Sequence, residues 1–217
     1  MTEAANPGRA AILERIRAGL HVTAPEAAAT PPSPDGIFAP VTNPLERFVA
    51  ECKSNLMECL LTEDKQESAR QLMQVLNSLP AGEVFAQDHP TLRELLVGVE
   101  SSRPVRWSSQ GAPSEASQAT ITMVEAVVAQ TGSIFVSASC GGRGASVVAP
   151  CHIAVASVSQ LVPDLTTVLR QASQKNILTN NSFACVISGS SRTADIEKIL
   201  VQGAHGPRRL VVILQKS

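Results

Sequence analysis

Residues 183–214 read FACVISGSSRTADIEKILVQGAHGPRRLVVIL, and this stretch decides the fold. Two apolar runs rich in β-branched residues, 183–187 and 209–214, predict strands. Between them a helix is expected to start near Thr193 and to end at Gly203. A strand, a helix and a second strand in this order form the parallel crossover unit of α/β proteins, which is right-handed.

Upstream, residues 133–139 and 145–156 are two more apolar runs, separated by Cys140 and a Gly-Gly-Arg-Gly segment. This pattern predicts a β-hairpin. Because the strands of a hairpin are antiparallel, the sheet is expected to be mixed.

The first half of the chain alternates short apolar runs with helical patterns, which indicates an α/β layer sandwich. Asn43 and Pro44 are typical of a helix start, as an N-cap followed by proline at the first helical position. Further helices are expected at 63–79, 91–97 and 162–172, short strands at 57–61, 84–86 and 105–107, and a polar loop at 108–118.

The chain is expected to have two parts. Six of its fourteen prolines fall between residues 24 and 44, which excludes a regular element there. Residues 1–42 are therefore predicted to hold a helix at 9–20 and a proline-rich linker. Residues 43–217 are predicted to form one α/β domain.

Composition excludes several classes of protein. The chain of 217 residues is 44% hydrophobic and 17% charged, which favours a folded core. Its net charge of −1, with no tyrosine and one tryptophan, argues against nucleic-acid binding. Without an apolar run of about 20 residues or a secretory signal, the chain is expected to be cytoplasmic, with no membrane span.

The five cysteines are odd in number and include no C-x-x-C pair. This spacing argues against a disulfide framework and against a metal or iron–sulfur site built from local cysteine pairs. We therefore expect no metal and no cofactor on this chain.

The turn at 188–193 is the first candidate ligand site. If it leaves a strand and opens a helix, its backbone N–H groups would be free to bind a phosphate or carboxylate. The alternative is that Thr193 only caps the helix. The candidate ligand-binding residues of this turn are Ser188, Gly189, Ser190, Ser191, Arg192 and Thr193.

Two further positions are candidates for the same site. Thr131 and Gly132 precede an expected strand, where the Thr131 and Ser133 hydroxyls could face a cleft or satisfy the turn itself. His205 is a candidate proton-transfer group, although a histidine between glycines can simply hydrogen-bond backbone in a turn.

Two other motifs are interpreted as structural. The Gly-Gly-Arg-Gly segment at 141–144 lacks the strand-to-helix setting of a P-loop, so a hairpin loop with Arg143 is expected. Cys151 and His152 are neighbours on a strand and should point to opposite faces, which argues against a thiol with its base.

Residues 188–197 and 203–207 closely resemble the LUD-domain family, and within it the lactate-utilisation protein C type. The resemblance extends back through 130–133, 149–153 and 162–164, in the family's order. It implies a three-layer α/β/α sandwich with a mixed sheet, similar to ribose-5-phosphate isomerases, glucosamine-phosphate deaminases and coenzyme A transferases. It also makes three separated motifs candidates for one cleft: the turn at 188–193, the segment with Thr131 and Gly132, and His205.

The resemblance further implies a component of a lactate-oxidising system that converts L-lactate to pyruvate, with iron–sulfur clusters on partner proteins. Gln130, Ser190 and Ala204 stand where the family commonly has Glu, Pro and Val. Because a glutamine cannot transfer a proton as a carboxylate does, Gln130 argues against acid–base chemistry at that position. A stand-alone enzyme acting on a phosphorylated sugar or an acyl-coenzyme A, and a non-catalytic assembly scaffold, are the alternatives.

Overall fold

The computed structural model describes residues 7–20, 40–99, 102–193, 201–202 and 206–216. The chain divides into two units, Met1–Ala39 and Pro40–Ser217. The first contains helix α1 (Pro7–Leu20), where a helix is expected at 9–20. The boundary between residues 42 and 43 stays a prediction.

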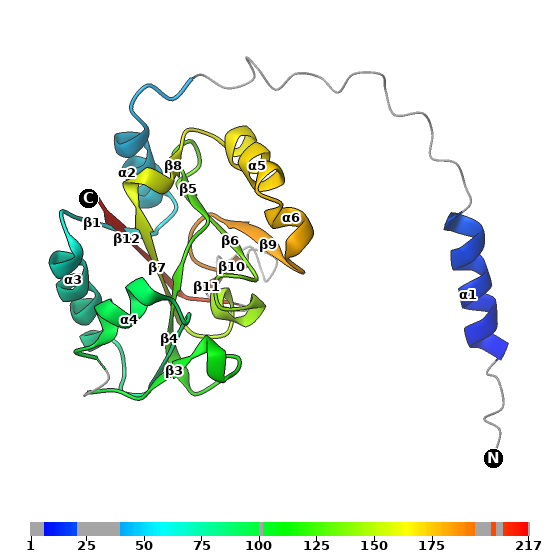
Figure 1. Ribbon diagram of the computed structural model, residues 1–217, viewed down its shortest axis with the longest axis horizontal. Coiled ribbons are helices and arrows are strands. Elements are labelled where there is room, and N and C mark those ends of the chain that lie inside the picture. Colours follow the sequence, from blue (N-terminus) through cyan, green and yellow to red (C-terminus); the bar gives the residue numbers. More distant parts are fainter. Residues whose placement is uncertain (1–6, 21–39, 100–101, 194–200, 203–205, 217) are drawn as a thin grey trace. The chain divides into compact units, whose positions relative to one another are not determined.

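The second unit is built on a six-stranded sheet in which every pair of neighbouring strands is parallel (Figure 1). Its order is β1 (Glu58–Thr62), β12 (Arg209–Gln215), β7 (Cys151–Ser157), β4 (Ser117–Met123), β2 (Glu83–Ala86) and β3 (Val105–Trp107).

A second, four-stranded sheet contains two antiparallel pairs and one parallel pair. Its order is β8 (Leu161–Val162), β5 (Ala126–Val128), β6 (Ser133–Ser137) and β9 (Ala184–Ile187). The hairpin predicted from 133–139 and 145–156 is wrong, because β6 and β7 lie in different sheets. The hairpin that forms joins β5 to β6. An apolar run predicts a strand, but it does not say which of two sheets the strand joins.

The predicted parallel crossover at the end of the chain is also wrong. β9 pairs with β6 in the four-stranded sheet, whereas β12 lies between β1 and β7 in the other. The helix expected near Thr193 does not begin there, since Arg192–Thr193 is strand β10 and pairs antiparallel with β11 (Val201–Gln202). The rest of that expected helix, 194–200, lies outside the described residues.

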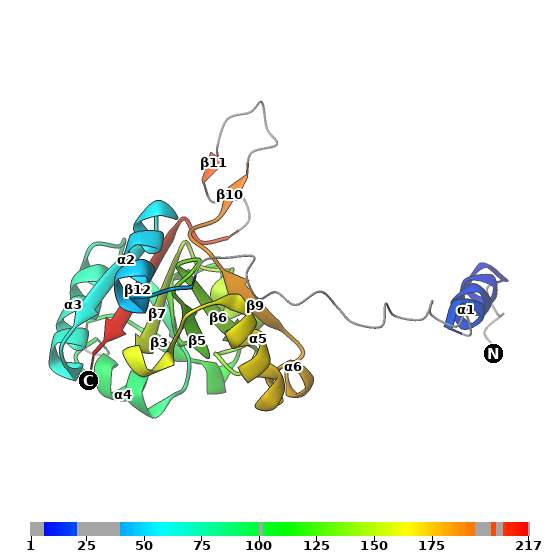
Figure 2. The ribbon, with the colours of Figure 1, turned by 90° about the horizontal axis from the view of Figure 1, so that it is seen from above.

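Helices and sheets stack in layers (Figures 1 and 2). Helices α3 (Lys65–Asn77) and α4 (Pro90–Leu96) cover one face of the six-stranded sheet. Helix α2 (Pro44–Ser54) and the four-stranded sheet cover the other face. Helix α5 (Leu165–Gln174) packs on the outer side of the four-stranded sheet, and α6 (Ile177–Asn180) follows it. The α/β sandwich is confirmed, and of its two packed sheets only the four-stranded one contains antiparallel pairs.

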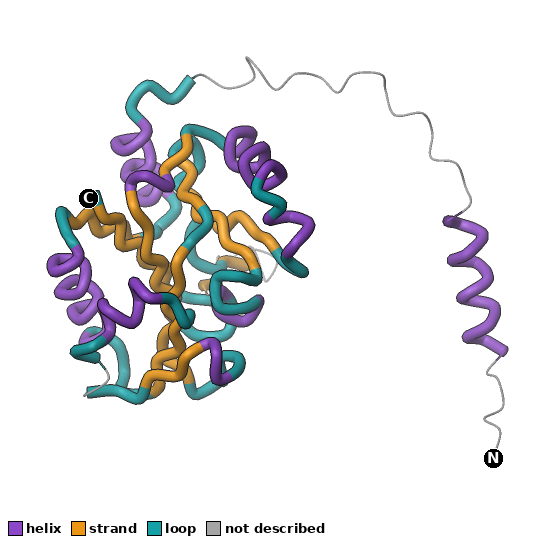
Figure 3. Tube along the Cα trace, in the orientation of Figure 1, coloured by secondary structure: helices purple, strands orange, loops and turns teal. Residues whose placement is uncertain are grey.

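Figure 3 shows the helices and strands of the described residues along the chain. Helices α2, α3, α4 and α5 and strands β1, β2 and β3 lie where they are expected. No strand is predicted for 119–128, where β4 and β5 lie, and β4 already starts at Ser117, inside the expected polar loop. Three short 3-10 helices complete the described structure: Ser108–Gln110, Arg143–Ser146 and Val158–Gln160.

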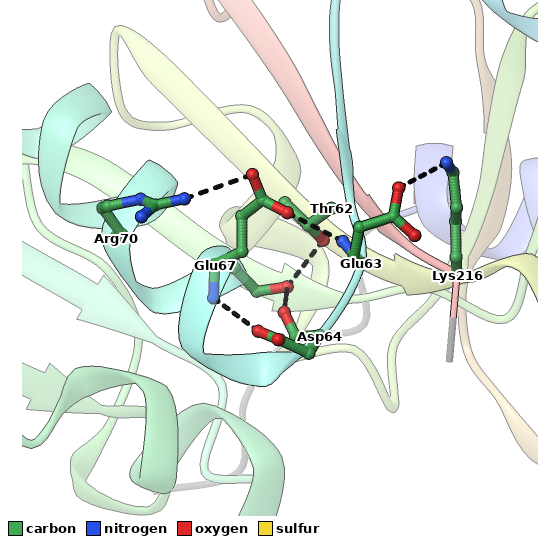
Figure 4. Close-up of polar contacts among 7 residues, drawn as sticks. Thr62, Glu63, Asp64, Glu67, Arg70 and Lys216 are labelled. Carbon is green, nitrogen blue, oxygen red and sulfur yellow. Dashed lines mark hydrogen bonds and ion pairs between the residues drawn. The ribbon is translucent and has the colours of Figure 1, made fainter.

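The turn from β1 into α3 shows how polar side chains fix a helix start (Figure 4). The Asp64 carboxylate accepts a hydrogen bond from the backbone N–H of Glu67 (2.8 Å). The Glu67 carboxylate in turn accepts from the N–H of Glu63 (2.9 Å). The first bond satisfies an N–H group that an isolated helix start would leave without a partner, and the second ties the residue before Asp64 to the first turn of α3.

Candidate functional site

The loop between β5 and β6 carries Thr131 and Gly132 and rests on the end of α2. Gly132 has φ +56°, and a Cβ there would lie 2.6 Å from the carbonyl carbon and the Cβ of Glu51. The side-chain amide of Asn55 donates to the carbonyl oxygen of Thr131 (2.8 Å). Helix α2 therefore fixes the position of this loop.

Three hydroxyl groups meet where β6 begins and β9 ends. Ser133 is fully buried, and its Oγ donates to Thr131 Oγ1 (2.6 Å). The same Oγ is 2.6 Å from Ser188 Oγ. We call Thr131, Ser133 and Ser188 the hydroxyl cluster. Because Ser188 is exposed, the cluster reaches the surface of the domain.

The structure thus joins two of the three motifs that are candidates for one site. Thr131 and Ser188 are 57 positions apart in the sequence, yet both bond the same serine. They meet because β6 and β9 pair antiparallel, with Ile134 opposite Ile187.

The segment after the hydroxyl cluster contacts the start of β12. Gly189, with φ +92°, and Ser190 are buried. The N–H of Ser191 donates to the carbonyl oxygen of Pro207 (2.9 Å), two residues before β12 begins. That N–H is therefore used within the fold.

The anion site in the turn at 188–193 is predicted on the assumption that this turn opens a helix. In the structure strand β10, and not a helix, begins at Arg192. In Figure 2, β10 and β11 lie beyond the end of β9. The side chains of Arg192 and Thr193, and the whole of His205, lie outside the described residues. Their roles as ligand-binding or proton-transfer residues stay predictions.

His152 is a buried group whose partner the sequence does not indicate. The side chain is fully buried, and its Nε2 lies 2.9 Å from Thr122 Oγ1. Its Nδ1 has no hydrogen-bond partner among the described residues. Burial lowers the pKa of His152 from 6.5 to about 4, so the ring is neutral near pH 7.

Cys151 does not act with His152 as a thiol and its base. Cys151 packs in the core under α3 and α4, while the side chains of β7 alternate between the two faces, as predicted. Burial also raises the pKa of the Cys151 thiol to about 11, which disfavours the nucleophilic thiolate.

The structure contains a polar cluster at the carboxyl ends of β2 and β3 that the sequence does not predict. Asp88 forms a bidentate ion pair with Arg93, at 2.6 and 2.9 Å, and also accepts from the Ser109 hydroxyl. These bonds, those from Arg93 first, lower the pKa of Asp88 to about 2. The Arg93 guanidinium lies 4.4 Å from the Trp107 ring centroid. The signal that could have found this cluster is its place, since ligands of parallel sheets bind at carboxyl ends.

A pocket of about 340 Å³ opens beside this cluster. The Gly-Gly-Arg-Gly segment lines it and is not the loop of a hairpin. Arg143 points elsewhere, because its guanidinium donates to the carbonyl oxygen of Ser182 (3.3 Å) and lies 5.5 Å from the Phe183 ring. The pocket is lined by Ser108, Gly111, Ala112, Ala138, Ser139, Gly141 and Gly142.

Within the described part of the chain, no three His, Cys, Asp or Glu side chains gather closely enough to hold a metal ion. The described helices include none that is both long and apolar enough to span a bilayer.

Comparison with known proteins identifies the family. Residues 110–215 match the LUD domain. The lactate utilization protein C of Shouchella clausii is 31% identical to the chain over 169 residues, which are 70% of this chain and 72% of that protein. The chain belongs to the LUD-domain family. Within that family it is of the lactate utilization protein C type.

Other matches of this LUD-domain chain agree. The lactate utilization protein C of Macrococcus caseolyticus is 29% identical over 151 residues, which are 66% of this chain and 65% of that protein. The chain therefore spans about two thirds of that relative's length. A crystal structure of a DUF162 family protein from Deinococcus radiodurans has a TM-score of 0.62 and 21% identity. The match covers 79% of this chain and 95% of the Deinococcus radiodurans chain, which shows that the two proteins share a fold.

Proposed function

We propose that this chain is a component of a lactate-oxidising system that converts L-lactate to pyruvate together with iron–sulfur partner proteins. The observation that carries the proposal is the 31% identity to a lactate utilization protein C over 70% of the chain. In this proposal the redox centres belong to the partners, because no three His, Cys, Asp or Glu side chains gather among the described residues of this chain to hold a cluster.

The hydroxyl cluster is the site that we propose for a small anionic ligand. Ser188 is exposed, and Ser133 holds it beside Thr131. Hydroxyl groups donate and accept hydrogen bonds, so Thr131 and Ser188 could bind the hydroxyl and carboxylate oxygens of a 2-hydroxy acid. Arg192, four residues after Ser188, would supply the positive charge.

The pathway role is tested by deleting the gene in the organism that encodes the chain and measuring growth on L-lactate. We expect growth to fail on L-lactate, to persist on pyruvate, and to return with the wild-type gene. Unchanged growth on lactate would favour the stand-alone enzyme. The purified chain would then be assayed alone with phosphorylated sugars and acyl-coenzyme A.

The ligand site is tested by complementing the same deletion with Ser188→Ala and Arg192→Ala. Each variant should reduce growth on lactate and leave the melting temperature nearly unchanged. Ser159→Ala is the matched control, because Ser159 is also exposed and its hydroxyl bonds a second serine, Ser157 (2.8 Å). Normal growth of both site variants would contradict the ligand site but not the pathway role. That result would favour a non-catalytic assembly scaffold.

The assignment of cofactors is tested by the visible spectrum and the iron and sulfide content of the purified chain. We expect no iron–sulfur chromophore. A reproducible cluster with matching iron and sulfide would contradict the division of roles between this chain and its partners.

A further inference from the structure

Strand β9 has an open edge. It is the last strand in the order of the four-stranded sheet, and among the described residues only β6 pairs with it. Figure 1 shows β9 at the margin of the second unit. All four of its residues are half-buried, whereas all residues of the neighbouring β6 are buried. One side of β9 is therefore available to a further strand.

The backbone groups on this open side can be identified from the ladder with β6. The carbonyl oxygen of Phe183 accepts from the N–H of Ala138 (2.9 Å) and so points toward β6. Because the backbone groups of an antiparallel strand alternate between its two sides, those of Ala184 and Val186 point outward. Within the part of the chain that the structure describes, these outward N–H and C=O groups have no backbone partner.

The edge of β9 also lacks the features that usually prevent strand pairing, which are charged side chains, proline and short length. β1, an outer strand of the other sheet, carries Glu58 in an ion pair with Arg209 (2.6 Å). The opposite outer strand, β3, carries Arg106 in an ion pair with Glu83 (3.0 Å), and β8 has only two residues. β9 has the sequence Ala-Cys-Val-Ile, so two copies of it do not repel each other.

We propose that β9 pairs antiparallel with β9 of a second copy of this chain, around a twofold axis at Cys185. In this register the outward groups of Ala184 bond those of Val186 of the other copy, and the reverse. Every outward backbone group of the strand then gains a partner. Because a twofold axis uses the same surface of both copies, the association closes at a dimer, in which the two four-stranded sheets become one.

The dimer also brings a positive charge to the hydroxyl cluster, a step that rests on the proposed function. The same register places Ser182 of one copy opposite Ser188 of the other, just beyond the ends of the paired strands. Arg143 is exposed, and its guanidinium donates to the carbonyl oxygen of Ser182 (3.3 Å). Arg143 of each copy therefore lies beside the hydroxyl cluster of the other, where it would attract the carboxylate of a ligand.

The dimer is tested on the full-length wild-type protein by analytical ultracentrifugation over a range of concentrations. We expect twice the monomer mass at high concentration and dissociation on dilution. Hydrogen exchange resolved to single amides should be slower at Ala184 and Val186 in the dimer than after dilution. A monomer at every concentration would overturn the proposal and leave this edge to a strand of a different protein. A dimer without protection of these two amides would overturn it as well.

The pairing is tested separately by Val186→Pro, which removes an outward N–H and none of the bonds to β6. Proline is tolerated at a sheet edge where the N–H faces away from the sheet, so this variant should be a folded monomer. Val186→Thr is the matched control, because it keeps the N–H and should remain a dimer. Melting curves report whether both variants fold. A folded Val186→Pro variant that still forms the dimer would contradict the pairing, and the exchange measurement decides if that variant misfolds.

The register is tested by oxidation with copper–phenanthroline. Cys185 of the two copies would lie in a non-hydrogen-bonded pair with Cα atoms about 4.5 Å apart, which is within the range for a disulfide. We expect a disulfide-linked dimer in which peptide mapping finds Cys185 joined to Cys185. Cys185→Ser should abolish this link, and Cys59→Ser, which removes another partly exposed thiol, should not. A link between the copies through a different cysteine would contradict the register.

The contribution of the second copy to the ligand site is tested by growth on lactate. Arg143→Gln should reduce growth without changing the mass of the dimer. Reduced growth with Ser188→Ala but normal growth with Arg143→Gln would overturn the role of Arg143 and leave the ligand site. Normal growth with both variants would contradict the ligand site and the role of Arg143, while ultracentrifugation and hydrogen exchange still decide whether the dimer forms.

Discussion

Gly132 is packed so closely against α2 that its missing side chain is a structural requirement. Its φ of +56° is left-handed, and an added Cβ would meet backbone atoms of Glu51 and Cys52 at 2.6 and 2.7 Å. A left-handed residue other than glycine and a forced overlap together cost about 2–4 kcal/mol.

We therefore expect Gly132→Ala to lower the free energy of unfolding by about 2–4 kcal/mol, measured by urea denaturation. Gly98→Ala is the matched control, because a Cβ there would meet only the flexible end of Met73, at 3.5 Å. Equal stability of the two variants would show that the loop moves away from α2 without cost.

His152 gives the domain a pH dependence of stability. Its pKa is about 4 in the folded chain and 6.5 in the unfolded chain, so the unfolded chain binds more protons between these values. The contribution of neutral His152 to the free energy of unfolding is complete above pH 6.5 and is lost as the pH falls toward 4. A difference of this size corresponds to roughly 3 kcal/mol.

The expected result is that acidification from pH 7 to 4.5 destabilises the wild type by about 2–3 kcal/mol more than His152→Gln. Thermal or urea unfolding at both pH values measures this difference. Glutamine keeps a hydrogen-bonding group near Thr122 and does not titrate. Identical pH slopes for the two proteins would mean that His152 is protonated inside the fold.

At the scale of elements, the start of α3 is a point where a single side chain stabilises a whole helix (Figure 4). Asp64 accepts the N–H of Glu67, and Ser68 Oγ donates to the carbonyl oxygen of Asp64 (3.0 Å). Asp64→Ala should reduce the free energy of unfolding by about 1 kcal/mol, while Asp64→Asn should retain most of it. Urea denaturation of the two variants and the wild type measures these differences. If asparagine lowers the free energy of unfolding as much as alanine does, helix capping is not the cause.

The helices and short strands could be predicted because their signals are local. Apolar spacing, Pro44 and Pro90 at helix starts, and polar caps such as Asp64 act within one or two turns. The sheet to which a strand belongs depends on partners that are distant in the sequence. The sequence therefore predicts that β6 pairs with β7 and β9 with β12, whereas β6 pairs with β5 and β9. The strand at Arg192 was also missed, since a threonine beside it is as typical of a helix cap as of a strand.

The candidate site was predictable in part for the same reason. Thr131 and the turn that begins at Ser188 are predicted to share one cleft, and the pairing of β6 with β9 brings Thr131 and Ser188 onto Ser133. For Ser133 the sequence leaves two roles open, a hydroxyl that faces a cleft and one that satisfies the turn, and it does not indicate that Ser133 joins Thr131 to Ser188. The cluster around Asp88 is not predicted, because Arg93 comes from α4 and Ser109 from the segment after β3, and only the parallel pairing of β2 with β3 brings that segment to Asp88.

At the scale of the whole molecule, the division into Met1–Ala39 and Pro40–Ser217 predicts that the second unit folds alone. A chain lacking residues 1–39 should keep a single cooperative melting transition, with a melting temperature close to that of the full chain. Calorimetry of both chains checks this. Loss of the cooperative transition would make the N-terminal residues part of the folding unit.

The position of β12 sets the order in which the six-stranded sheet can form during synthesis. β12 follows all the other described strands along the chain, yet it occupies an inner place in this sheet, between β1 and β7. Until residues 209–215 have left the exit tunnel, β1 has no partner in that sheet, and the apolar edge of β7 is open. A nascent chain in this state exposes unpaired strand edges, which favour aggregation, and a stop codon before residue 209 removes an inner strand of the sheet.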